Sequence, residues 1–134
     1  MDATRAELDY AFFAQWAKVS QEGTLTAIDA SFLRMITDLN TVVPFALAGR
    51  IRFPKGVDEA NLELLLVEAN LQLNITQLLK PEANTAYGDG FHHALFALNT
   101  SIPTLEYGKV TARISIDGTE VRTLMFELVP RPEA

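Results

Sequence analysis

The stretch that decides the fold runs from Tyr107 to Val129 and reads YGKVTARISI DG TEVRTLMFELV. Apolar and polar side chains alternate in its first half, which is typical of a strand with one buried face. The apolar set there is Val110, Ala112, Ile114 and Ile116. Asp117-Gly118 follows, and Asp-Gly between two such runs is a strong hairpin signal, because a tight turn needs residues that tolerate positive φ. The chain is therefore expected to end in an antiparallel β-hairpin.

The second half of this hairpin carries an irregularity. Its apolar side chains are Leu124, Phe126 and Leu128. A regular two-residue turn sets Val121 opposite Ile114, on the buried face. Leu124, Phe126 and Leu128 are each an odd number of residues from Val121, so their side chains would point to the other face. It also sets Arg113 opposite Arg122, where like charges repel. One extra residue restores the match, so the sequence predicts a β-bulge near Arg122-Thr123.

Turn signals divide the rest of the chain into short segments of apolar and polar alternation. The clearest lies at 42–53, where Phe45, Leu47, Gly49, Ile51 and Phe53 alternate with Ala46, Ala48, Arg50 and Arg52. Such a pattern is typical of a half-buried strand. By the same criteria, strands are expected near 9–20, 24–33, 42–53, 61–67, 71–76, 91–99, 109–116 and 119–129.

These segments predict an all-β fold, with residues 1–134 forming one antiparallel sandwich. We expect about eight strands in an immunoglobulin/C2-like Greek key. Two segments, 2–19 and 58–80, leave an α+β alternative open. Leu8, Phe12 and Trp16 also fit a helical stripe, and 58–80 is rich in Leu, Glu and Ala. Leu62, Leu64 and Leu66 alternate with other residues, as do Leu71, Leu73 and Ile75 after a turn, and this alternation favours strands.

Composition limits the function classes. The chain has 134 residues, 49% of them hydrophobic, so a core needs no disulfide or metal support. It contains no cysteine, which excludes a thiol nucleophile and a Cys-ligated zinc site. The net charge of −6 disfavours nucleic-acid binding. The sequence shows neither a signal-peptide pattern nor an apolar run of membrane-spanning length, so a cytoplasmic location without a membrane partner is expected.

Three blocks resemble an uncharacterised bacterial family, the domain of unknown function with number 6941. They are Tyr10-Ala11-Phe12-Phe13, the run Gln21 to Ile28, and the run Phe45 to Pro54. The sequence departs from the family pattern at Thr24, where a lysine is usual, and at Gln15-Trp16, where a Cys-Asp pair is frequent. The resemblance implies a small soluble bacterial β-sandwich. It implies no activity and transfers no catalytic residue.

The sequence contains little that indicates chemistry. The only two histidines, His92 and His93, are adjacent and face opposite sides of a strand, so they cannot easily chelate one metal together. Asp89 would be a third ligand in a metal-dependent hydrolase, the weakest of the hypotheses. No serine lies in a nucleophile elbow. We therefore expect no catalytic residue, no cofactor and no metal.

Apolar residues beyond the needs of a core favour a non-catalytic interaction module that binds another protein or itself. The candidate interaction surface is Trp16, Phe13, Leu33, Met35, Leu62, Leu64, Leu71 and Leu73. A contiguous exposed apolar patch marks such a surface. The alternative is a small-ligand or carbohydrate-binding sandwich, with Trp16, Tyr87 and Tyr107 as its stacking residues.

Overall fold

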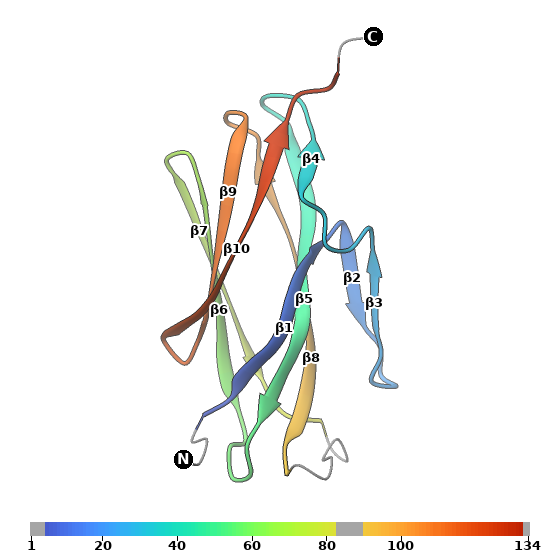
Figure 1. The fold of residues 1–134 in the computed structure, drawn as a ribbon, viewed down its shortest axis with the longest axis vertical. Helices are drawn as coiled ribbons and strands as arrows, with labels where there is room; N and C mark the ends of the chain where they lie inside the picture. Colours follow the sequence, from blue (N-terminus) through green and yellow to red (C-terminus); the bar gives the residue numbers. More distant parts are fainter. Residues whose placement is uncertain (1–4, 83–89, 133–134) are drawn as a thin grey trace.

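The computed structural model describes residues 5–82 and 90–132 and contains ten strands and no helix within them (Figure 1). The first five strands are β1 (Glu7–Ala14), β2 (Trp16–Val19), β3 (Leu25–Ile28), β4 (Arg34–Ile36) and β5 (Val42–Phe53). The other five are β6 (Ala60–Glu68), β7 (Leu71–Leu79), β8 (His92–Pro103), β9 (Gly108–Ile116) and β10 (Thr119–Val129). The α+β alternative is excluded for the described residues.

Two sheets pack face to face, and a small hairpin lies outside them (Figure 1). One sheet has the order β1-β5-β8, the other β4-β10-β9-β6-β7, and β2-β3 form the hairpin. Strands β5 and β8 are neighbours in the first sheet, and their successors β6 and β9 are neighbours in the second. This is the Greek-key arrangement of immunoglobulin-like sandwiches, so the predicted fold class is confirmed.

Two details of the predicted sandwich need correction. The expected strand at 9–20 is two strands, because the chain leaves β5 after Ala14 and Gln15 donates its N–H to the carbonyl of Ile28 (2.8 Å). A further short strand, β4, occupies a segment expected to be a loop. It pairs in parallel with β10, so the sandwich is not wholly antiparallel.

The terminal hairpin forms as predicted, with the bulge slightly earlier in the chain. Asp117 and Gly118 both have positive φ, 50° and 84°, as the primed turn requires. The register shifts between Glu120 and Arg122, so Val121 is the extra residue. Beyond the bulge Arg113 faces Thr123 instead of Arg122, and Phe126 and Leu128 point into the core. The bulge therefore restores the buried face and separates two like charges.

The core lies between the two sheets and is closed at one side by four aromatic rings. Phe126 of β10 contacts Phe13 of β1 and Phe45 of β5, with ring centroids 4.9 and 5.3 Å apart. Phe32, which precedes β4, packs against the same ring at 5.2 Å. Edge-to-face contacts of this kind add about 0.5–1.5 kcal/mol to the stabilisation from burial. This cluster fixes the start of β4 against both sheets.

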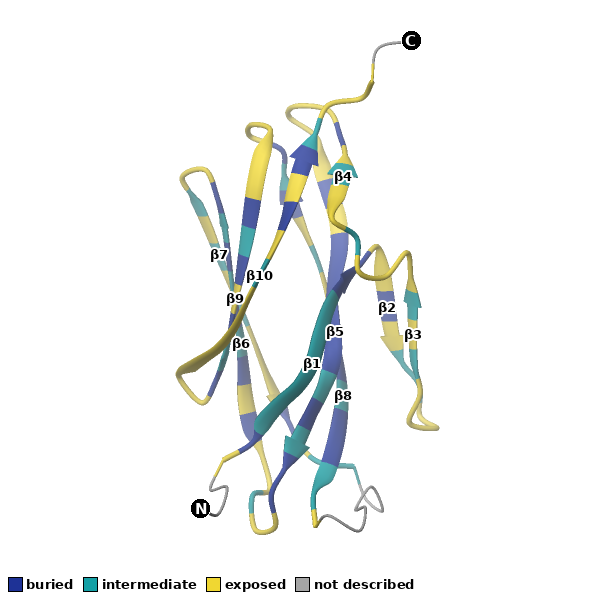
Figure 2. Cartoon of the chain, in the orientation of Figure 1, coloured by how far each residue is buried: buried dark blue, intermediate teal, exposed yellow. Residues whose placement is uncertain are grey.

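The outer face of β5 is covered as well, by the β2–β3 hairpin. Ala17 of the hairpin packs on Ala46 and Ala48, and all three are fully buried. Small side chains on both surfaces let the hairpin approach the sheet closely. Strand β5 is thus buried on both sides at its centre and only half-buried at Arg50 and Arg52. Figure 2 shows the central part of β5 in the colour of buried residues.

Candidate functional site

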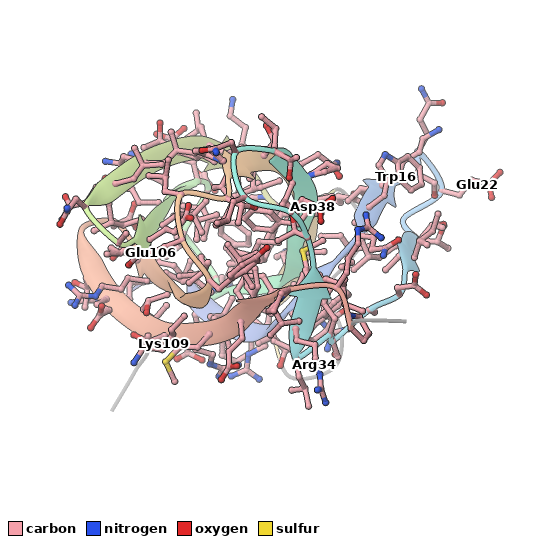
Figure 3. The ribbon with its side chains drawn as sticks, turned by 90° about the horizontal axis from the view of Figure 1, so that it is seen from above. Trp16, Glu22, Arg34, Asp38, Glu106 and Lys109 are labelled. Atoms are coloured by element: carbon pink, nitrogen blue, oxygen red, sulfur yellow. The ribbon has the colours of Figure 1, made fainter. Side chains whose placement is uncertain are left out.

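An open groove lies beside β4, where the hairpin, β5 and the residues after β10 meet. Its volume is about 520 Å³. We call it the end groove. Its apolar lining is Trp16, Ile28, Met35, Ile36, Val42, Val43 and Pro44, and its polar lining is Gln15, Thr37, Asp38, Thr41 and Arg131. Figure 3 shows Trp16 on the hairpin beside the sandwich, with Asp38 on the neighbouring loop.

The β2–β3 hairpin positions Trp16, the first residue of β2. Trp16 pairs with Ile28 across the hairpin, and both side chains are exposed. A two-stranded hairpin is only marginally stable alone, so its position depends on what holds it. The amide of Asn99 on β8 bonds both backbone groups of Ala17, the residue next to Trp16. The indole is therefore fixed to the sandwich through its neighbour.

The floor of the groove is the beginning of β5, where β1 is missing. Strand β1 pairs with β5 only from Ala14↔Ala46 onward, so Val42 to Phe45 have a strand neighbour on one side alone, β8. Proline in strands is confined to such unpaired edges, because it has no N–H to donate. Pro44 lies in this gap and faces Ser101 of β8. Because Pro44 cannot donate, the gap favours occupation by side chains over the addition of a strand.

The turn between β4 and β5 forms one wall, and three threonines fix it. The hydroxyl of Thr37 lies 3.1 Å from the hydroxyls of both Thr41 and Thr104. Thr104 donates its N–H to the carbonyl of Thr41 (2.7 Å) and accepts from the N–H of Asn40 (2.8 Å). Thr37 and Thr104 are buried, and the bond between their hydroxyls satisfies these groups inside the protein. The wall is consequently preorganised.

One ion pair lies at the rim. The Nε atom of Arg131 is 3.2 Å from both carboxylate oxygens of Asp38. Both side chains are more than half exposed, so the pair contributes at most about 1 kcal/mol to stability. Its position matters more than its energy, because it sets one cation and one anion beside an apolar surface.

Exposed apolar side chains concentrate at this end of the molecule. The exposed fractions in the groove are Trp16 43%, Ile28 49%, Ile36 53% and Val42 65%. Leu39, in the wall, and Leu105, which follows Thr104, are also exposed. Contiguous apolar surface with a polar rim is typical of an interaction site.

The structure divides the predicted interaction surface. Trp16 and Met35 line the end groove, and Leu33 is the most exposed large apolar residue among those described, at 76%. Phe13, Leu62 and Leu64 belong to the core, which corrects their assignment to a contact surface. Strand β6 lies between β9 and β7, and its even-numbered positions face inward. Leu71 and Leu73 are half-buried on the edge strand β7.

Besides Trp16, the exposed large apolar residues of the groove are Ile28, Ile36 and Val42, and the predicted set includes none of these three. Ile36 lies between the expected strands 24–33 and 42–53, in a segment that also contains the apolar residues Met35 and Leu39, and an apolar loop is itself a signal of a contact surface. Ile28 and Val42 carry no comparable signal, because a single apolar residue at a strand end looks the same whether it is covered or exposed.

The histidines do not assemble a site in the described part of the chain. His93 is buried and His92 half-buried on β8. Within residues 5–82 and 90–132 no three His, Cys, Asp or Glu side chains gather as metal ligands would. Asp89 and Tyr87, named in two of the hypotheses, lie outside the described residues. Tyr107 is exposed but does not line the end groove.

Comparisons with known proteins show no family for this chain. No family model matches the sequence, and no curated protein sequence matches it. The resemblance to the uncharacterised bacterial family therefore stays a prediction. Among solved structures, the chain is similar to an immunoglobulin-like protein from Pseudomonas aeruginosa at 11% identity. The match covers 94% of this chain and 98% of that one, with a TM-score of 0.47. Within the described residues no helix has the length and apolar character needed to cross a bilayer.

Proposed function

We propose that the chain is a non-catalytic binding module that holds an apolar segment of another protein in the end groove. The observation that carries this proposal is the concentration of exposed apolar side chains around Trp16, Ile36 and Val42. Tryptophan is among the residues most enriched at the energetic centres of protein interfaces. The surrounding Thr37, Asp38 and Arg131 supply the polar rim that such interfaces have.

A protein segment suits this groove because the surface continues beyond it. Leu33 lies beside the groove, next to Arg34 of β4, and Leu39 lies in its wall. An occupant long enough to cover them must extend past the groove itself. The Asp38–Arg131 pair offers both signs of charge, so a partner with a polar group flanking its apolar side chains can bond at the rim.

The test measures the affinity of three variants of the purified chain for a partner protein, which is isolated from cells that produce the chain. Trp16→Ser and Ile36→Ser remove apolar groups of the groove. Met125→Ser is the matched control, since Met125 is similarly exposed, at 55%, but lies on β10 outside the groove. We expect the first two to weaken the partner's affinity at least about tenfold, as loss of a central interface residue does. Equal affinity for all three variants would contradict the proposal.

A small apolar or sugar ligand is the second candidate, favoured by the groove volume. About 520 Å³ lies within the range of ordinary ligand pockets. Trp16 is the single tryptophan of the chain, so its fluorescence reports directly on occupation. Saturable changes on titration with a panel of mono- and oligosaccharides and small aromatic compounds would favour this candidate. An unchanged spectrum with the panel, together with a change on addition of the partner protein, would favour the first.

A further inference from the structure

We propose that β7 pairs edge to edge, antiparallel, with β7 of a second copy of this chain. The two five-stranded sheets would then form one continuous sheet across a two-fold axis. This surface is independent of the end groove, because β7 and β4 are opposite edges of the same sheet. Figure 1 shows β7 at the outer side of the sandwich, away from the β2–β3 hairpin.

Strand β7 differs from the other sheet edges in having no protection. Exposed strand edges are usually blunted by charge, proline or short length. Strand β4 has three residues and includes Arg34, and β1 carries Glu7 and Asp9. Strand β8 ends in Pro103, and the carbonyl of His93 accepts a bond from the N–H of Glu82 (3.1 Å).

Strand β7 has none of these protective features. Its nine residues, LQLNITQLL, include no charge, no proline and no glycine. Because its pairing with β6 alternates, every second backbone amide and carbonyl of β7 points away from the sheet. Those groups offer hydrogen bonds to another strand along its whole length. Within the described residues, no strand other than β6 pairs with β7.

The absence of charge on β7 lets a second copy of this chain approach at this edge. The chain carries a net charge of −6, so two copies repel each other over most of their surface. On β7 they meet without charge. Two acidic residues lie on the neighbouring strand β6: Glu68, which is buried and opposite Leu71, and Glu63, which is opposite Thr76. In the paired sheets the two Glu63 side chains are three strand spacings apart, about 14 Å, which exceeds the Debye length of about 8 Å at physiological salt.

The register of this pairing follows from the strand itself. A two-fold axis at Ile75 pairs all nine residues and keeps core-facing positions opposite core-facing positions. Ile75 then faces its own copy, and Asn74 faces Thr76 of the other chain. Gln72 faces Leu78, so the two copies of Gln72 lie about 20 Å apart.

Cysteine substitution tests this register, since the chain has no cysteine of its own. Ile75→Cys places two sulfurs across the axis within disulfide reach. Gln72→Cys is the matched control on the same strand. We expect air oxidation to convert Ile75→Cys into a covalent dimer and to leave Gln72→Cys unlinked. Equal cross-linking of both variants, or of neither, would overturn the proposed register.

Light scattering after size-exclusion chromatography tests the association without any cross-link. We expect the unmodified chain to form a dimer whose fraction rises with concentration. Asn74→Lys combined with Thr76→Lys sets lysine opposite lysine and should raise the dissociation constant about tenfold or more. Gln21→Lys combined with Glu22→Gln makes the same net charge change in the exposed turn of the β2–β3 hairpin and should leave the dimer unchanged. Circular dichroism confirms that each variant is folded.

Charge reversal gives the sharpest result. The Asn74→Lys, Thr76→Lys chain mixed with an Asn74→Asp, Thr76→Asp chain should form a heterodimer, because each lysine then faces an aspartate. A chain that is monomeric at every concentration would overturn the proposal. So would a dimer that survives the paired lysines, or one that dissociates only with Trp16→Ser and therefore uses the end groove.

Discussion

The side-chain amide of Asn99 holds the backbone of Ala17 at both of its polar groups. Its Oδ1 accepts from the N–H of Ala17 (3.3 Å), and its Nδ2 donates to the carbonyl of Ala17 (2.8 Å). Ala17 is buried against β5, so without Asn99 these two groups lose their partners in the protein. A single side chain of the sheet thereby fixes the hairpin that carries Trp16.

Replacement of Asn99 should therefore loosen the end groove. We expect Asn99→Ala to lower the free energy of unfolding by about 1–2 kcal/mol, the value of two modest hydrogen bonds. Asn99→Asp should cost at least as much, because its second oxygen faces a carbonyl instead of donating to it. In both variants the emission of Trp16 should shift to longer wavelength as the indole gains water. An unshifted spectrum would show that the alanine contacts alone hold the hairpin.

Gly49 lies where β1 passes close over β5, and alanine should not be tolerated there. A Cβ atom at Gly49 would overlap the carbonyl oxygen of Tyr10 and lie 2.8 Å from Cζ of Phe96. We expect Gly49→Ala to destabilise the fold by about 3 kcal/mol, the upper range for overpacking. Urea denaturation measures this.

Gly56→Ala is the control for that experiment. Gly56 has a φ of +90° but no atom within 4 Å of an added Cβ. Its cost should be limited to backbone strain, about 1–2 kcal/mol. If both variants lost the same stability, steric overlap at Gly49 would not be the cause.

Ala69, in the turn between β6 and β7, has a left-handed backbone with φ of 48°. This conformation costs a residue with a Cβ about 1–2 kcal/mol, whereas glycine adopts it freely. Glycine also gains entropy in the unfolded chain, which offsets about 0.4–1 kcal/mol of the relief. We therefore expect Ala69→Gly to stabilise the fold by about 0.5 kcal/mol, seen as a higher urea midpoint. A lower midpoint would contradict the assignment of strain to this turn.

Glu68 ends β6 as a buried side chain whose Oε1 accepts the N–H of Leu105 at 3.0 Å. Its Oε2 atom has no hydrogen-bond partner among the described residues. Glu68→Gln keeps the acceptor and should change stability little. Glu68→Ala leaves the N–H of Leu105 without its partner and should cost about 1–3 kcal/mol. Thermal unfolding of the two variants side by side separates the hydrogen bond from the charge.

The architecture could be predicted where local pattern and tertiary environment agree. The alternation in β5 and β9 and the Asp117-Gly118 turn specify strands and their inward faces directly. The bulge could be predicted because only an extra residue turns Phe126 inward. Its position at Val121 could not, because either neighbouring site restores the same parity.

Other features depend on contacts between distant segments. Strand β4 has three residues and exists because it pairs with β10, which no local pattern reveals. The end groove takes residues from four separate parts of the chain, so its composition follows only from the fold. Leu62 and Leu33 illustrate the limit: both are leucines in apolar segments, yet one is fully buried and the other is 76% exposed.

The central claim is that the end groove binds an apolar segment of another protein, and site-specific photo-cross-linking in living cells tests it most directly. A photoreactive amino acid at Val42, the most exposed of the large apolar residues in the groove at 65%, would lie against any occupant. The same group at Met125, outside the groove, is the control. The account predicts one discrete cross-linked partner from position 42, lost when Trp16→Ser is added, and none from position 125. Absence of a cross-link at 42, or the same partner from both positions, would contradict it.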